Sequence, residues 1–285
     1  MHRYAGRGGN AVIGVAAEED RRDVQKIWKT CFGDADAYIR FFIKTHLPAG
    51  RCLVSKEGGR AVAMLFLLPS RCFYGGEGRA VQYVYAAATL PEFRRRGLME
   101  GLLAYAHETA VAQGMLFTCL KPASEALYRY YGKLGYHTAF HVTHRILPAS
   151  ALDAQFHLSK ADADTVFAQR AQTFPVGLLW GRELFDFVLR EWKMAGGESL
   201  AFPGGYCMAC KDGQRVLCKE IVPGGWTLSA VAAALCERYG LPETEFRLPW
   251  NGAPTPDGGM LRPADDALDP AAFEAARPYF NLMLD

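Results

Sequence analysis

Residues 81–113 read VQYVYAAATLPEFRRRGLMEGLLAYAHETAVAQ, and this stretch decides the fold class. Its first part, 81–89, is rich in Val, Tyr and Ala and predicts a strand. From about Gly97 to Gln113 the spacing of the apolar residues predicts a helix. The residues that share one face of this helix are Leu98, Leu102, Leu103, Ala106 and Ala110. A short charged turn joins the two elements, so the order is strand, turn, helix.

The residues on either side predict further strands and helices. The expected strands are 11–17, 51–56, 60–68, 115–120 and 136–146, and the expected helices are 18–32, 36–46 and 124–134. Three antiparallel strands therefore come first, followed by helix, strand, helix and strand. This order predicts an α+β fold with a mixed, mainly antiparallel sheet flanked by helices.

A border between two domains is expected at 147–153, where Pro148-Ala149-Ser150 interrupts the pattern. We expect a flexible leader at 1–10 and a first domain at 11–147. The second domain, 154–285, is expected to be a smaller α+β lobe. Its coarse order of hairpin, helix and strand echoes residues 51–120, which makes it a candidate degenerate copy of the first domain.

Local signals place the elements of this second lobe. A cap formed by Ser159 and Asp162 predicts a helix over 159–172. Asp212-Gly213 predicts the turn of a hairpin between strands 206–211 and 215–222. Further helices are expected at 182–195 and 227–240, short strands at 246–248 and 260–262, and a strand-like run at 279–284.

The composition excludes several classes of protein. The chain has 285 residues, of which 50% are hydrophobic, enough for one large or two medium cores. Lys and Arg number 32 against 30 Asp and Glu, and a net charge of +2 argues against a general nucleic-acid-binding surface. The longest apolar run, 62–69, is too short to span a bilayer, and the polar leader lacks the apolar core of a signal peptide. We therefore expect a cytoplasmic protein that binds neither nucleic acid nor a membrane.

The eight cysteines are scattered and lie mostly in apolar runs, as expected of buried free thiols. Cys207 and Cys210 form the only Cys-x-x-Cys pair, and no second pair accompanies them to complete a zinc site. Residues three apart on a strand point to opposite faces. We therefore expect no metal site, and metal or redox use of this pair is the weaker alternative.

The turn at 91–98, PEFRRRGL, is the candidate binding site. The helix that starts near Gly97 presents unpaired N–H groups and a partial positive charge at its first turn. Gly97 lets a ligand approach the backbone closely, and Arg94, Arg95 and Arg96 add three cations. Together these groups suit a pyrophosphate. The alternative on spacing alone is a solvated basic turn before a surface helix.

This turn resembles motif A of the GNAT-type N-acetyltransferases, a Gln/Arg-x-x-Gly-x-Gly/Ala pattern that follows a strand. Arg94-x-x-Gly97-x-Met99 matches its first two positions, and Met99 replaces the usual small residue while still supplying a backbone N–H. The resemblance implies an acetyl-CoA site. Its pyrophosphate would be held by Arg94, Arg95, Arg96, Gly97, Leu98 and Met99, and its pantetheine arm by the backbone of Ala87, Ala88 and Thr89.

A second patch, YYGKLGY at 130–136, resembles the end of the last core helix of that family. In the family this Tyr lies near the thioester sulfur, which implies that Tyr131 protonates the leaving thiolate as a general acid. Ser124 stands where many members carry Asn, and the resemblance implies a cofactor contact there. The alternative for Tyr131 is an aromatic core residue.

The resemblance covers about 12–146. Tyr83-Val84-Tyr85 followed by the three arginines is similar to the two-lobed bacterial branch that includes the enhanced-intracellular-survival acetyltransferases. It implies an acetyl-CoA-dependent N-acetyltransferase that acts on a primary amine of a small molecule or a peptide. The second lobe is then expected to shape the acceptor cleft.

The general base for this reaction stays open, because no Glu or His stands out. The carboxylate of Asp285 is a candidate, since some related members use their C-terminal carboxylate, and a chain of waters is an equal alternative. A last strand that merely completes a sheet would exclude Asp285. Met99, Ser124 and the lack of an obvious base favour the rival hypothesis, a non-catalytic acyl-CoA-binding sensor or interaction module. The oligomeric state is open, and a homo-oligomer is compatible with the sequence.

Overall fold

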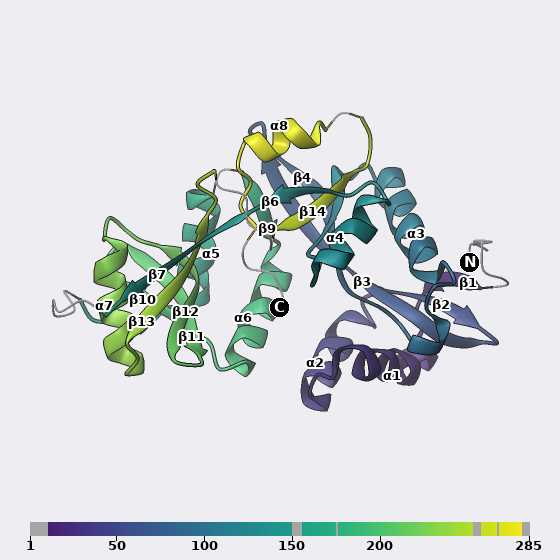
Figure 1. Cartoon of the computed structure of the whole chain (residues 1–285), viewed down its shortest axis with the longest axis horizontal. Coiled ribbons are helices and arrows are strands. Elements are labelled where there is room, and N and C mark those ends of the chain that lie inside the picture. Colours follow the sequence, from purple (N-terminus) through teal and green to yellow (C-terminus); the bar gives the residue numbers. More distant parts are fainter. Residues whose placement is uncertain (1–10, 150–155, 175, 253–257, 267, 281–285) are drawn as a thin grey trace. The chain divides into compact units, whose positions relative to one another are not determined.

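Figure 1 shows the computed structural model of the chain, which describes residues 11–149, 156–174, 176–252, 258–266 and 268–280. The expected leader, 1–10, lies outside the described residues. Contacts divide the chain into two compact units. Unit 1 comprises the described residues up to Ser70, Ala80–His137 and Met260–Asp269, and unit 2 comprises Arg71–Arg79, Thr138–Gly259 and the described residues from Pro270. The expected ranges 11–147 and 154–285 are continuous, whereas each unit takes segments from separate parts of the chain.

The sheet of unit 1 is mixed and mainly antiparallel, with the strand order β1-β2-β3-β4-β5-β14. Its strands are β1 (Val12–Val15), β2 (Cys52–Glu57), β3 (Arg60–Tyr74), β4 (Glu77–Thr89), β5 (Phe117–Leu120) and β14 (Gly259–Pro263). β4 and β5 run parallel, whereas β1–β2, β2–β3 and β5–β14 are antiparallel. A parallel pair needs a crossover connection, and helix α3 (Leu98–Ala112) forms it.

Helices cover both faces of this sheet (Figure 1). On one face lie α1 (Arg21–Phe32), which follows a 3-10 turn at Glu18–Asp20, and α2 (Asp36–His46). Their Trp28 and Phe42 pack against Phe66 of β3, with ring centroids 5.6 and 5.0 Å away. On the other face, α3 and α4 (Glu125–Gly132) share a buried cluster with the strands. The predicted strand–turn–helix order of 81–113 and the α+β fold are both confirmed.

The sheet of unit 2 has the order β7-β13-β12-β11-β10-β8. Its strands are β7 (Val142–Pro148), β8 (Ser159–Lys160), β10 (Glu198–Phe202), β11 (Gly205–Asp212), β12 (Arg215–Val222) and β13 (Glu243–Pro249). Its helices are α5 (Ala163–Thr173), α6 (Arg182–Met194), α7 (Leu228–Tyr239) and α8 (Pro270–Ala275). β6 (His137–Phe140) precedes β7 in the chain, and β9 (Gly177–Trp180) lies between α5 and α6.

Unit 2 repeats the central connection of unit 1. β12 and β13 are parallel and α7 joins them, just as α3 joins β4 and β5. The last strand of each sheet comes from the other half of the chain. β7, which follows the first set of elements, pairs with β13, while β14, which follows the second set, pairs with β5. The expected similarity between the two halves of the chain is therefore present in the order of the strands in their sheets.

Some predicted elements differ from the structure. Ser159 lies in β8, and Asp162 caps α5 because its carboxylate accepts the Thr165 N–H at 2.9 Å. The single strand expected at 136–146 is two strands, β6 and β7. β9, β10 and α8 were not predicted, because each is short and lacks a clear apolar period. Of the expected run 279–284, only Tyr279 and Phe280 lie in the described part of the chain.

The remaining sequence-based exclusions concern membranes and cysteines. No helix in the described part of the chain is both long and apolar enough to cross a bilayer. All eight cysteines are free thiols. Cys207 is buried and Cys210 is partly exposed on β11, so the Cys-x-x-Cys pair is not a disulfide.

Candidate functional site

The two parallel strands of unit 1 part near their carboxyl ends. Their pairing places Gln82 opposite Thr118 and Tyr83 opposite Cys119, and it stops there. Ala86 has a φ of 50°, a left-handed conformation that a non-glycine residue rarely adopts, and it interrupts the extended course of β4. Beyond this break, the edge of β4 at 87–89 is not bonded to β5. Its backbone groups are therefore placed to meet a ligand.

The turn after β4 brings further backbone donors to this edge. A short 3-10 helix, Pro91–Phe93, leads into the arginines, and Arg95 has a φ of 62°. Gly97, with a φ of 75°, is the N-cap of α3 and has no side chain to accept the N–H groups of the first helical turn. These N–H groups and the positive end of the helix dipole are thus left for an anion.

A cavity of about 670 Å³ lies along the edge and the turn. We call it the β4 cavity. Most of the predicted site residues line it, and these are Ala87, Ala88, Thr89, Arg94, Arg95, Arg96, Gly97, Leu98, Met99 and Tyr131. Ser124 does not line the cavity, although it is the N-cap of α4. Asp285 lies outside the described residues.

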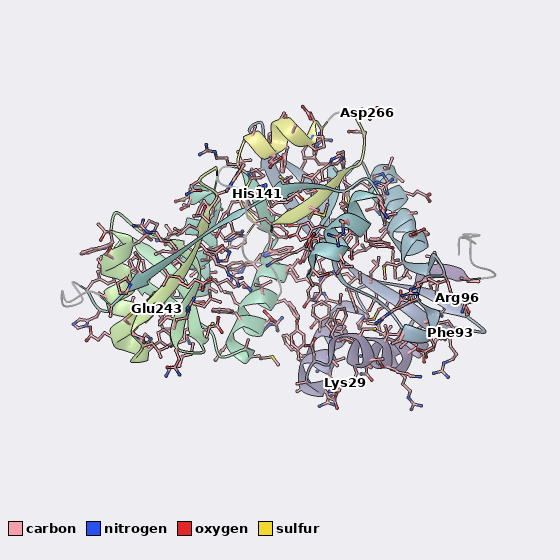
Figure 2. The ribbon with its side chains drawn as sticks, in the orientation of Figure 1. Lys29, Phe93, Arg96, His141, Glu243 and Asp266 are labelled. Carbon is pink, nitrogen blue, oxygen red and sulfur yellow. The ribbon has the colours of Figure 1, made fainter. Side chains whose placement is uncertain are left out.

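The three arginines differ in what they bind. Arg94 donates from Nε to the carbonyl oxygen of Thr89 at 3.1 Å. Arg96 pairs with Glu57 of β2 at 2.9 Å. Its guanidinium also lies over the ring of Phe93, 5.4 Å from the ring centroid; Figure 2 labels Arg96 and Phe93. Arg95 forms no hydrogen bond or ion pair with any residue in the described part of the chain. The turn therefore offers one uncommitted guanidinium to the cavity.

The Thr89 carbonyl is already bonded within unit 1. Besides Arg94, the thiol of Cys31 donates to it at 3.4 Å, which occupies both lone pairs of the oxygen. A ligand cannot donate to this oxygen without displacing one of the two donors. The backbone contact that the resemblance implies for Thr89 therefore does not include its carbonyl oxygen while both hydrogen bonds are present. Ala87 and Ala88 keep their place on the unpaired edge.

Two tyrosines of α4 reach the cavity side by side. The rings of Tyr130 and Tyr131 lie 5.3 Å apart, and both side chains line the cavity. Burial raises the pKa of the Tyr131 hydroxyl to about 12. Burial, and then the nearby carboxylate of Glu100, also raise the pKa of Tyr130. Both phenols therefore stay protonated at neutral pH and can donate a proton.

Several residues that line the cavity were not named from the sequence, and these are Cys31, Phe32, Phe93, Glu100, Leu127 and Tyr130. Cys31 and Phe32 come from the end of α1, far from the motif in sequence. Glu100 lies one turn into α3 from Gly97, so helical spacing could have found it. Among the described residues that line the cavity, it is the only one that carries a carboxylate.

The groups around the cavity fit an elongated ligand that carries amides and phosphates. An unpaired strand edge suits an amide-containing arm, and free helix N–H groups beside Arg95 suit a pyrophosphate. Coenzyme A has both parts. In the described part of the chain, no group of three or more His, Cys, Asp or Glu side chains is placed to hold a metal ion.

Comparison with protein families and solved structures identifies proteins to which this chain is similar. Residues 13–139 match the family model described as an acetyltransferase (GNAT) domain. No curated protein matches the sequence. A GCN5-related N-acetyltransferase from Anabaena variabilis is 18% identical, with a TM-score of 0.70, and the match covers 90% of this chain and 73% of that one.

Two further structures match along most of the chain. Eis1 from Mycobacterium abscessus is 17% identical with a TM-score of 0.64, over 90% of this chain and 74% of that one. A tandem GNAT protein from the clavulanic acid biosynthesis pathway is 14% identical with a TM-score of 0.54, over 90% of this chain and 99% of that one. At such identities the similarity shows a common fold, including its two-lobed form.

Proposed function

Residues 13–139 form an acetyltransferase domain of the GNAT type, and from this premise we propose that the chain transfers the acetyl group of acetyl-CoA to a primary amine of a small molecule or a peptide. One observation carries the proposal. The free edge of β4 and the turn 94–99 are adjacent in the sequence, and Tyr131, from a separate helix, lines the same cavity.

The residues around the β4 cavity divide the binding of acetyl-CoA among them. The backbone of Ala87 and Ala88 would hold the amides of the pantetheine arm. The N–H groups that follow Gly97, including that of Met99, would hold the pyrophosphate together with Arg95. When bound, acetyl-CoA supplies an activated acetyl group as a thioester.

Tyr131 is the proposed general acid. Attack by an amine on the acetyl carbonyl expels a thiolate, and a protonated phenol nearby can donate its proton to the sulfur. The raised pKa of about 12 keeps the Tyr131 hydroxyl protonated at the pH at which an amine is attacked.

An amine must lose its proton before or during attack. We propose that the Asp285 carboxylate or a chain of waters accepts this proton. Glu100 is a further candidate, because its carboxylate lines the cavity near Tyr130.

A non-catalytic acyl-CoA sensor is the second candidate function. It is favoured by the position of Ser124 away from the cavity and by a described cavity lining without a histidine. In this case the same residues bind the cofactor, and no amine is acetylated.

Calorimetric titration of the full chain with acetyl-CoA, followed by thiol release on a panel of primary amines, tests both functions. Binding together with thiol release on at least one amine class supports the transferase. Binding without release on any amine supports the sensor. Absence of binding contradicts both. The matched pair Arg95→Gln and Arg22→Gln separates a site effect from a loss of surface charge, because Arg22 is an exposed cation of α1 that does not line the cavity.

A further inference from the structure

We propose that Arg94 is a positioning residue that fixes the end of β4, and that Arg95 alone among the three arginines is left to bind the phosphates. This inference rests on the proposed function and deepens it. It assigns different tasks to adjacent residues that the sequence presents as equivalent cations.

Arg94 ties the two ends of the turn together. Its Nε donates to the carbonyl oxygen of Thr89, the last residue of β4, at 3.1 Å. The same oxygen accepts the Cys31 thiol, and an Nη atom of Arg94 lies 3.9 Å from the Cys31 sulfur. The guanidinium thus closes the turn on the strand end and links both to α1.

The peptide group between Thr89 and Leu90 is held from both sides. Its oxygen accepts from Arg94 and Cys31, and its N–H, that of Leu90, donates to the carbonyl of Val62 on β3 at 3.0 Å. A peptide that is bonded at both polar groups has a defined plane. The orientation of the neighbouring edge at Ala87 and Ala88 follows from that plane.

Arg96 also has partners within unit 1, because it pairs with Glu57 and lies over the ring of Phe93. Its charge is compensated by the Glu57 carboxylate, which lies 2.9 Å away. Arg95 has no such partner in the described part of the chain and lines the cavity. The charge that a pyrophosphate meets at this turn therefore comes from Arg95 and the helix N-terminus.

Glutamine and lysine separate the two roles at position 94. The amide nitrogen of Gln stands the same number of bonds from the backbone as Nε of Arg, so Arg94→Gln keeps a donor for the Thr89 oxygen without a charge. Lys keeps the charge but places its nitrogen one atom further out. If Arg94 acts by its hydrogen bond to Thr89, Gln should preserve acetyl-CoA binding better than Lys. If Arg94 binds phosphate by its charge, Lys should preserve binding better than Gln.

The test is calorimetric titration of the full chain with acetyl-CoA at low and high NaCl for Arg94→Gln, Arg94→Lys, Arg94→Met and Arg95→Gln. We expect Arg94→Met to weaken binding by about tenfold at both salt concentrations, and Arg94→Gln to stay within about threefold of the wild type. Arg94→Lys should bind more weakly than Arg94→Gln. Arg95→Gln should lose about tenfold at low salt and less at high salt, because screening weakens the charge it removes.

The opposite ranking overturns the inference. If Arg94→Lys binds better than Arg94→Gln, or if the loss in Arg94→Met fades with salt as it does in Arg95→Gln, then Arg94 is a phosphate ligand. Thermal unfolding of each variant checks the fold, and the comparison of Gln with Lys decides even if Arg94→Met does not fold. A wild-type chain that binds no acetyl-CoA contradicts the proposed function itself, which is a separate result.

Discussion

Gly97 and Thr227 occupy the same position in the two halves of the chain, but only Thr227 caps the helix that follows with its side chain. Each is the N-cap of a crossover helix between two parallel strands. Thr227 accepts the Ala230 N–H with its hydroxyl at 3.2 Å, whereas Gly97 has no side chain to do so. The turn before Thr227 is closed further, because Gly224 lies so near Gly204 that a Cβ would clash with the backbone there.

One acetyl-CoA per chain is the first prediction. The α7 turn has no arginine, its helix donors are partly capped, and Trp226 is bonded to the Pro203 carbonyl at 3.0 Å. A phosphate therefore finds fewer free N–H groups there than at the start of α3, and no arginine beside them. Calorimetric titration should give a stoichiometry close to one. A value near two would mean that unit 2 also binds.

Replacement of Gly97 by Ala should weaken acetyl-CoA binding. A Cβ at this position meets no atom closer than 3.9 Å, so the effect comes from the backbone conformation, whose φ is 75°. A left-handed φ costs a non-glycine residue roughly 1 kcal/mol, and relaxation of the turn would move the helix N–H groups. We expect a roughly five- to tenfold rise in Kd. Gly114→Ala is the matched control, because Gly114 also has a positive φ, lies just beyond the C-terminal end of α3 and does not line the cavity. An equal rise in Kd for the control would show that the effect is general destabilisation.

Replacement of Tyr131 by Phe should reduce kcat by roughly a hundredfold and leave the Kd for acetyl-CoA within about twofold. The ring and its packing are kept, and only the proton donor is removed. Tyr130→Phe, the neighbouring phenol in the same cavity, should change kcat by less than about fivefold. Equal activity of Tyr131→Phe and the wild type would exclude Tyr131 from the reaction.

The pH profile of acetyl transfer should show no loss of the general acid below about pH 10. Burial raises the pKa of Tyr131 to about 12, so its hydroxyl stays protonated through this range. The rate should rise with pH as the acceptor amine loses its proton, and then level off. A fall in kcat between pH 9 and 10 that disappears in Tyr131→Phe would contradict the raised pKa.

His46 should make the chain less stable at acid pH. Its ring is fully buried, and desolvation, together with the charge of Arg51, lowers its pKa to about 3. Because the folded pKa is below the unfolded one, the stabilisation is complete above pH 6.5 and is lost as pH falls toward 3.

Urea unfolding at pH 8 and pH 5 measures this loss. The wild type should lose about 2 kcal/mol more of its unfolding free energy than His46→Gln, which keeps an acceptor for Arg51 but does not titrate. Equal losses in the two proteins would mean that His46 is not the group responsible.

The candidate site shows where prediction from the sequence succeeds. The β4 edge, the arginine turn and the start of α3 form one continuous stretch. Strand composition, the spacing of Leu98 and Leu102, and Gly97 act over a few residues, so a local pattern is enough to place them. The same holds for the capped start of α7 at Thr227 and the hairpin turn at Asp212-Gly213.

Other features were beyond local reasoning. Ser124 was assigned to the site because related proteins carry Asn at the matching position. It is the N-cap of α4, and it does not line the cavity, although other residues of that helix do. The division of the chain into units was expected to follow its order, but β14 pairs with β5 and β7 pairs with β13. Strand partners are chosen by hydrogen bonds between distant segments, which leave little trace in either segment alone.

The sequence by itself determined that a basic turn joins a strand to a helix, since that depends on residues adjacent in the chain. It did not determine what each arginine of the turn does. In the folded chain, Arg94 donates to Thr89, Arg96 pairs with Glu57, and Arg95 has no partner among the described residues. These differences arise only because the fold brings α1, β2 and β4 together. A side chain's partner is whatever the fold brings within about 3 Å of it, and that distance is a property of the tertiary structure.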